Sequence, residues 1–286
     1  MIILCADDYA MTEGVSRAIG ELAAARRLSA TSVLATSRHW PNLAPRLLIH
    51  RAHLSIGLHL NLTLGSPLGP MPRLAPQGKL PSLASLTLWS LSGVLGVEEI
   101  ETEIGRQLDS FEKNLGFPPD HIDGHQHVHV LPGIRRTLLD AVATRYGSCA
   151  PLMRDPSVQR TSANVLRLAG AKALAVTALA LGFRRSAARR GLRTNDSFAG
   201  FSAFDERQPY ADELEQALAA PGERHLVMCH PGHPDAELAR LDPVVDRRRM
   251  EYETLMQNAS LMGRIWRPSR RSDGPAFDWS RAEPSS

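Results

Sequence analysis

The sequence has few cysteines, few aromatic residues and few lysines, and each shortage excludes a class of protein. The three cysteines, Cys5, Cys149 and Cys229, are odd in number and far apart, which excludes a disulfide framework and a Cys-x-x-Cys zinc site. Aromatic residues make up 5% of the 286 residues, and the net charge is only +3. Most of the basic residues are scattered arginines without a nucleic-acid-binding motif, so we expect no nucleic-acid partner.

The sequence also lacks a hydrophobic run long enough to cross a membrane. Its most apolar stretch, residues 173–183, is shorter than the roughly 20 residues that a transmembrane helix needs. Met1 is followed at once by the strand-like residues 2–6, without the charged and apolar leader of a signal peptide. We therefore expect a cytoplasmic protein with no transmembrane segment and, if the chain assembles, a homodimer.

The alternation of strand-like and helix-like segments predicts an α/β fold. Short apolar runs typical of buried strands span residues 2–6, 31–36, 54–60, 121–130 and 224–229. Helical patterns span residues 12–27, 42–50, 97–115, 133–145 and 244–262. This alternation implies a parallel sheet, and no Gly-rich nucleotide-binding loop follows the first strand. The pattern therefore favours a distorted, TIM-like (β/α) barrel.

We expect one barrel domain over residues 1–263 and a flexible tail, rich in Arg, Pro and Ser, over residues 264–286. A long loop rich in Pro and Gly spans residues 65–81 and is expected to help shape the substrate cleft. Residues 161–190 leave two alternatives open. They form either a buried packing helix, which we favour, or an amphipathic segment near a lipid-linked substrate.

Side chains suited to catalysis gather where the predicted strands end. Asp7 and Asp8 directly follow the first strand, where the chain turns and both carboxylates can line one site. A single Asp there would more often be a helix cap, and a single His59 within an apolar strand would more often be a hydrogen-bonded core residue. His230 follows the last strand, before a Pro-Gly turn. These three signals are weak alone, but their positions repeat.

The segment 121–129 carries the strongest signal. If it is a strand, alternate residues share one face, namely His121, Asp123, His125, His127 and His129. Four histidines and one aspartate on one face are hard to bury without a metal or an extensive hydrogen-bond network. Together with the Asp pair and the other two histidines, they are typical of a mononuclear metal site with a separate acid and base.

Four motifs then give a specific resemblance. ADDYA at residues 6–10, GLHLNLT at 57–63, HIDGHQHVH at 121–129 and MCHPGH at 228–233 resemble, in this order, the YdjC/ChbG family of carbohydrate deacetylases, HpnK-like relatives included. The likeness extends from Met1 to about Met262, and TNDSFAGF at 194–201 also resembles a family segment. The chain departs from the family at Ala10, where glycine is common, and in its C-terminal tail, which has no family counterpart.

The resemblance implies a distorted (β/α) barrel that hydrolyses the N-acetyl group of an amino sugar with one divalent metal ion. Asp8, His59 and His125 match the family's metal ligands, with Zn²⁺ as the most expected metal and Mg²⁺, Co²⁺, Ni²⁺ or Mn²⁺ as alternatives. Asp7 matches the base that activates a metal-held water, and His230 matches the late acid. Residues expected to support these groups or the substrate are Arg154, Asp123, His127 and Asn61, with Arg154 pairing with Asp7.

Two other functions remain alternatives. The first is a metal-dependent phosphoesterase or amidohydrolase, because His125 and His127 form an HxH pair; such enzymes usually place that pair after the first strand and bind two metals. The second is a metal-stabilised sugar-binding protein, against which Asp7 and His230 argue, since binding alone needs neither a base nor an acid. The sequence does not decide whether the substrate is an acetylated oligosaccharide or a glycolipid.

Overall fold

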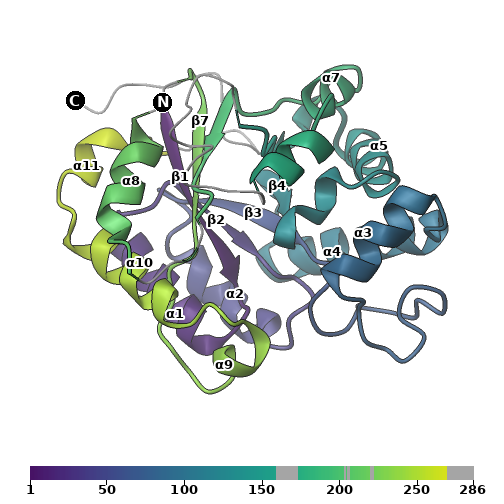
Figure 1. The fold of residues 1–286 in the computed structure, drawn as a ribbon, viewed down its shortest axis with the longest axis horizontal. Helices are drawn as coiled ribbons and strands as arrows, with labels where there is room; N and C mark the ends of the chain where they lie inside the picture. The colour runs from purple at the N-terminus through teal and green to yellow at the C-terminus, as the bar shows by residue number, and fades with distance from the viewer. Residues whose placement is uncertain (159–172, 203, 205–206, 220–221, 269–286) are drawn as a thin grey trace.

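A computed structural model describes residues 1–158, 173–202, 204, 207–219 and 222–268. Seven parallel strands form one sheet in the order β5-β4-β3-β2-β1-β7-β6, and helices surround its outside (Figure 1). The strands are β1 Ile2–Tyr9, β2 Ala30–Val33, β3 Ser55–Leu60, β4 His121–Gly124, β5 Leu152–Met153, β6 Ser197–Ala199 and β7 His225–Cys229. The helices are α1 Glu13–Ala24, α2 Trp40–Leu48, α3 Leu83–Ser92, α4 Val97–Leu115, α5 Ile134–Tyr146, α7 Phe183–Ala188, α8 Tyr210–Leu218, α9 Leu238–Leu241, α10 Asp246–Gln257 and α11 Leu261–Arg264.

The two edges of the sheet approach each other before β6. Thr194 bridges Met153 of β5 in parallel, and the Met153 amide donates to the Arg193 carbonyl at 2.8 Å. The Asn195 side chain accepts from the Asp155 amide at 2.7 Å and donates to the Asp155 carbonyl at 2.9 Å, so it replaces a strand pairing. The sheet therefore curls into a nearly closed barrel, and the prediction of a distorted (β/α) barrel is confirmed.

Helix α4 forms where its periodicity predicts it. Its buried face carries apolar residues three and four positions apart, Ile100, Ile104, Leu108, Phe111 and Leu115. Glu98 and Glu99 lie in the first turn, where they complement the helix dipole, and Gly116 ends the helix at a left-handed φ of 79°. The same helix buries Gln107, whose amide bonds the backbone of Asn61 at 2.7 and 3.0 Å. Helix α4 thus fixes the chain just beyond β3.

Several segments differ from the predictions, among them β5, β6 and α8, which were not predicted. The expected strand over 121–130 is wrong beyond Gly124, because residues His125–Val130 form a 3₁₀ segment in which Gln126 and His127 take left-handed φ values of 53° and 60°. The expected helix over 244–262 divides into α10 and α11, because the Asn258 side chain accepts from the amide and hydroxyl of Ser260. Helix α3 was not predicted, since it is apolar on nearly all sides and shows no period.

Several expectations fall partly or wholly outside the described residues. Residues 269–286 contain most of the predicted tail, and residues 159–172 contain part of the apolar segment 161–190. The predicted loop at 65–81 contains no helix or strand. Within the described part of the chain, no helix combines the length and the apolar character needed to span a bilayer.

Candidate active site

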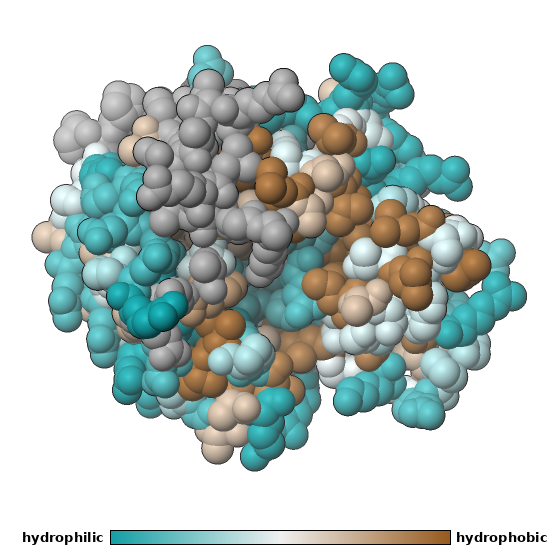
Figure 2. Space-filling model, viewed as in Figure 1, coloured by the Kyte–Doolittle hydropathy of each residue, from teal (hydrophilic) through white to brown (hydrophobic). Residues whose placement is uncertain are grey.

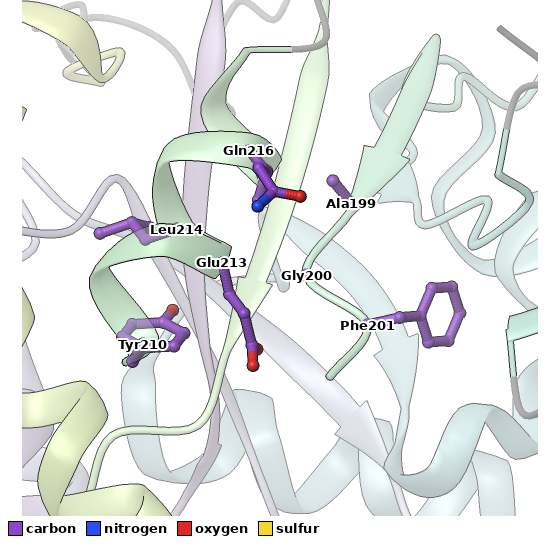
Figure 3. A pocket seen from close by; sticks show the side chains of 8 residues that line it. Ala199, Gly200, Phe201, Tyr210, Glu213, Leu214 and Gln216 are labelled. Atoms are coloured by element: carbon purple, nitrogen blue, oxygen red, sulfur yellow. The ribbon is translucent and has the colours of Figure 1, made fainter. Parts of the chain in front are cut away.

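Six of the nine predicted site residues line one cavity at the carboxyl ends of the strands. The cavity has a volume of about 430 Å³. Its wall includes Asp7, Asp8, His59, His125, His127, His230 and Arg248. A second, much smaller cavity of about 20 Å³ lies between the end of β6 and α8, and the side chains in its wall include none of the predicted site residues (Figure 3). The cavity of about 430 Å³ is therefore the candidate active site, because the predicted residues line it.

An irregularity in β1 brings both carboxylates of the Asp pair to this cavity. The pairing register of β1 with β2 shifts between Ala6 and Tyr9, and Asp8 takes a left-handed φ of 71°. On a regular strand the two side chains would point to opposite faces, whereas this bulge turns both toward the cavity. Aspartate tolerates the left-handed region better than most residues.

Asp8, His59 and His125 offer three ligand atoms that lie within 4.8 Å of one another. Asp8 Oδ1 lies 2.9 Å from His125 Nδ1 and 3.3 Å from His59 Nε2. On its other side, His59 Nδ1 meets Asp123 Oδ1 at 2.6 Å and Ser32 Oγ at 3.0 Å. Metal-binding histidines usually have such a partner on the second ring nitrogen, which orients the ring. These three residues could hold one divalent cation.

Two other groups of candidate ligands overlap with an arginine. They are Cys5, His121 and Asp123, and Asp7, His59 and Asp123. The guanidinium of Arg154 binds both oxygens of Asp7 at 2.6 and 2.7 Å, and it also contacts Asp123 and the sulfur of Cys5. A cation therefore already lies among these ligands. Of the candidate groups in the described residues, only the one built on Asp8 suits a metal ion.

The charges around the cavity also suit a divalent cation. Four carboxylates and two guanidinium groups form two sets of ion pairs there: Arg154 contacts Asp7 and Asp123, and Arg248 contacts Asp8 and Asp242. When the histidines are neutral, as they must be to ligate a metal, these six groups sum to a net charge of −2, which one divalent ion would neutralise. Burial lowers the pKa of His59, but the carboxylates of Asp123, Asp7 and Asp8 outweigh it and raise that pKa to about 10. A positive charge is therefore strongly favoured at this position.

The two carboxylates that share Arg154 differ in their acidity. Burial raises the pKa of Asp7 above its ordinary value, even though Arg154 opposes the change. Burial acts in the same direction on Asp123, but there Arg154 and His59 prevail and hold the pKa well below its ordinary value. Asp7 thus has the greater affinity for a proton, which suits a general base.

The remaining predicted residues take different positions. His230 lines the cavity, with its ring centroid 5.6 Å from that of Phe204. His127 lines it too and packs against Phe201 at 5.3 Å between ring centroids. Asn61 lies instead beside a neighbouring cavity of about 280 Å³. Its amide donates to the Leu64 carbonyl at 2.7 Å, so Asn61 holds the loop that follows β3.

Comparison with known proteins agrees with this geometry. The sequence matches the family described as YdjC-like protein over residues 1–261. The chain belongs to this family. A chitooligosaccharide deacetylase of Proteus mirabilis (strain HI4320) is 29% identical over 270 residues, 91% of each chain. A carbohydrate deacetylase of Homo sapiens is 30% identical over 249 residues, 82% of this chain and 75% of the human one.

A solved structure supports the fold of this YdjC-like protein. It is described as a putative cellobiose-phosphate cleavage protein from Enterococcus faecalis V583 and covers 90% of both chains with a TM-score of 0.63 and 23% identity. The resemblance inferred from the four motifs is therefore confirmed at the level of the family and of the fold.

Sequence reasoning missed the residues that helix α10 of this YdjC-like protein contributes. Arg248 donates to Asp8 Oδ2 at 2.7 Å and to Asp242 Oδ2 at 2.6 Å. Because Arg248 engages Oδ2, Oδ1 of Asp8 faces the two histidines. Glu251, one turn further along, accepts a hydrogen bond from the His230 amide at 2.5 Å. Nothing in the sequence distinguishes these two residues from the charged neighbours on the same helix, so no signal could have identified them.

Proposed function

We propose that this protein is a metal-dependent hydrolase that removes the acetyl group from an N-acetylated amino sugar. The observation that carries the proposal is the pairing of two groups in one cavity. Asp7, held by Arg154, lies next in the chain to Asp8, which faces His59 and His125. This arrangement provides a base beside a candidate metal site, as hydrolysis of an amide requires.

The broader prediction, an enzyme of the carbohydrate deacetylase class, is confirmed by family membership and by the relatives. Relatives that cover most of the chain are named chitooligosaccharide deacetylase and carbohydrate deacetylase. The finer parts of the proposal concern the metal, the role of each residue and the substrate.

Asp8, His59 and His125 would hold one divalent metal, for which we propose Zn²⁺, because one carboxylate and two imidazoles suit it. When bound, such an ion would act as a Lewis acid and lower the pKa of water toward about 7. Asp7 takes the proton from the water that attacks the acetamide carbonyl carbon, and Arg154 holds that carboxylate in one orientation.

His230 donates the proton that the leaving amine needs. The nitrogen of the sugar leaves as an amine and needs a proton, because an expelled amide anion would be far too basic. A histidine suits this role, since its ordinary pKa of about 6.5 lets it hold a proton near neutral pH. His230 lies in the wall of the same cavity as Asp7.

The surface beside the cavity favours a glycolipid over a free oligosaccharide. Helix α3 exposes Leu88 and Leu91 at 65% and 62%, and Val94 just beyond it is 69% exposed. Leu83, at the start of the same helix, lines the cavity. Figure 2 shows this hydrophobic surface beside the hollow at the centre of the view. An apolar group attached to the amino sugar could lie on α3 while the acetyl group enters the cavity.

The test is acetate release from N-acetylglucosamine, diacetylchitobiose and an N-acetylglucosaminyl lipid. Metal-free protein would be assayed alone and with Zn²⁺, Co²⁺ or Mg²⁺. We expect metal-dependent acetate, with the lipid as the best substrate. A bound-metal ratio of two with phosphoesterase activity would favour the HxH alternative, and sugar binding without any acetate would favour a binding protein.

Two variants test the roles of the residues. We expect Asp7→Asn to keep one metal per chain and to lose about 10²- to 10⁴-fold in kcat, the usual contribution of a general base. His125→Ala should lose the metal itself, as measured by the metal content of the dialysed protein. Full activity of Asp7→Asn would refute the assignment of the base.

A further inference from the structure

Among the buried carboxylates that the mechanism above does not use, Glu251 contacts the backbone of His230. Glu251 lies on α10 and is 1% exposed. Its Oε2 accepts a hydrogen bond from the backbone amide of His230 at 2.5 Å. His230 directly follows the last residue of β7, where the strand hydrogen bonds end. The contact of Glu251 therefore fixes the backbone at the residue whose side chain enters the cavity.

A second hydrogen bond holds the same turn against the same helix. The Gly232 amide donates to the Arg248 carbonyl at 3.0 Å. A Cβ on Gly232 would lie 3.2 Å from Val15 and 3.4 Å from Arg248, so the turn packs tightly against α10 and α1. Helix α10 therefore holds the turn on both sides of Pro231, with contacts from residues one helical turn apart.

Placing Glu251 here is costly for the fold. A buried carboxylate loses its hydration, which costs several kcal/mol unless partners replace it. The charged and titratable groups that face it are Arg247 and Arg248 on its own helix, Glu213 and Tyr210 on α8, Cys229 at the end of β7, and His230 just beyond that strand. An apolar residue would fill the same space without this cost, but it could not bind the His230 amide.

We infer that Glu251 is a positioning residue, which holds the backbone of His230 so that its imidazole can deliver a proton to the leaving amine. This inference rests on the proposed function, in which His230 is the acid. Glu251 does not touch the candidate metal ligands, and Arg248 is the residue of α10 that contacts Asp8. Loss of Glu251 should therefore affect kcat and leave metal binding intact.

The experiment measures kcat, KM and bound metal with the best substrate of the acetate panel and with metal present. We expect Glu251→Ala to lower kcat about 10- to 100-fold, with KM and metal content unchanged, because small displacements of catalytic groups have effects of this size. Glu251→Gln keeps an oxygen that accepts from the amide, so it should retain kcat within about threefold. Glu253→Ala, at an exposed position of the same helix, is the matched control.

A double-variant cycle then asks whether Glu251 acts through His230. In a His230→Ala background, Glu251→Ala should cause no further loss of kcat, because the group that it positions is gone. Additive losses would overturn the inference, and so would an unchanged kcat in Glu251→Ala. If Glu251→Ala does not fold, Glu251→Met in both backgrounds takes its place. Absence of acetate from the wild-type protein would instead refute the proposed function.

Discussion

Removing the arginine that joins two buried carboxylates should destabilise the protein strongly. Arg154 is fully buried and contacts Asp7 and Asp123, which are also buried. Arg154→Met keeps an unbranched side chain of similar width and removes the positive charge. Both carboxylates would then lose the guanidinium that they share, and His59, beside Asp123, would remain as a counter-charge. We expect the free energy of unfolding to fall by about 3–5 kcal/mol at pH 8, the usual cost of breaking a buried ion pair.

The contacts explain the size of this loss. At the 2.6 Å between Arg154 Nη1 and Asp7 Oδ2, an effective dielectric constant of about 20 gives roughly 6 kcal/mol of attraction. The cost of burying the guanidinium offsets part of this attraction, which leaves the expected loss of about 3–5 kcal/mol.

The loss should also depend on pH. Removing Arg154 takes away the cation that lowers the pKa of both carboxyl groups, so the pKa of Asp123 should rise from its depressed value. The folded-state pKa of Asp7, which burial already holds above the unfolded value of about 4, should rise further. Groups of this kind contribute stability that is present below the unfolded pKa and lost as the pH rises through the folded pKa. The deficit of Arg154→Met relative to the wild type should therefore shrink as the pH falls from 8 to 5.

Urea unfolding of metal-free protein at pH 8, 6.5 and 5, followed by circular dichroism, measures this deficit. The double variant Arg154→Met with Asp7→Asn serves as the control, because one of the two carboxylates is then neutral. It should recover part of the lost stability at pH 8. A deficit below about 1 kcal/mol, or one that does not change with pH, would refute the role given to Arg154.

Three further predictions concern stability and use the same unfolding assay. Gln126 is exposed and has a left-handed φ of 53°, so Gln126→Gly should stabilise the protein by up to about 1 kcal/mol and Gln126→Val should destabilise it by a similar amount. Equal stabilities of the two variants would show that the backbone at this position is not strained. A Cβ on Gly57 would lie 2.3 Å from the buried His121 ring, so Gly57→Ala should cost about 1–3 kcal/mol, whereas Gly105→Ala in open space should stabilise. Burial raises the pKa of Glu251 to about 7, so the stability of the wild type falls as the pH rises and this buried carboxyl group ionises. Glu251→Gln has no group to ionise there, so between pH 5 and pH 8 its free energy of unfolding should rise by about 2 kcal/mol relative to the wild type. An unchanged difference between the two proteins would refute the burial of a charge at this position.

The sequence predicts the fold best where one structural signal dominates. Strands β1 and β7 are buried on both faces and pair with each other, so each reads as a continuous apolar run. The prediction is wrong at His125–Val130, because alternation of His with other residues also suits a strand. The strand ends because Gln126 and His127 take left-handed backbone conformations, which the residue types of this segment do not predict.

The candidate site was predictable in part because barrel topology restricts where active residues lie. Asp8, His59 and His230 all follow or end strands, and parallel strands bring their carboxyl ends together at one edge. Arg248 and Glu251 reach the same edge from α10, outside the sheet. Helix packing decides which face of α10 turns inward, and the charged sequence around it carries no apolar period from which to infer that face.

The contacts of each site residue explain how the chain orients the side chains of the cavity. Asp8 contacts Arg248 through Oδ2, so its Oδ1 faces the histidines. His59 contacts Asp123 through Nδ1, so its Nε2 faces Asp8. Asp7 is held in the same way by Arg154, which binds both of its oxygens. In each case a protein partner fixes the orientation of the side chain, so little freedom remains to be lost when an ion or a substrate arrives. The many buried charges therefore serve preorganisation, and their cost to the fold is the reason that each of them has a partner.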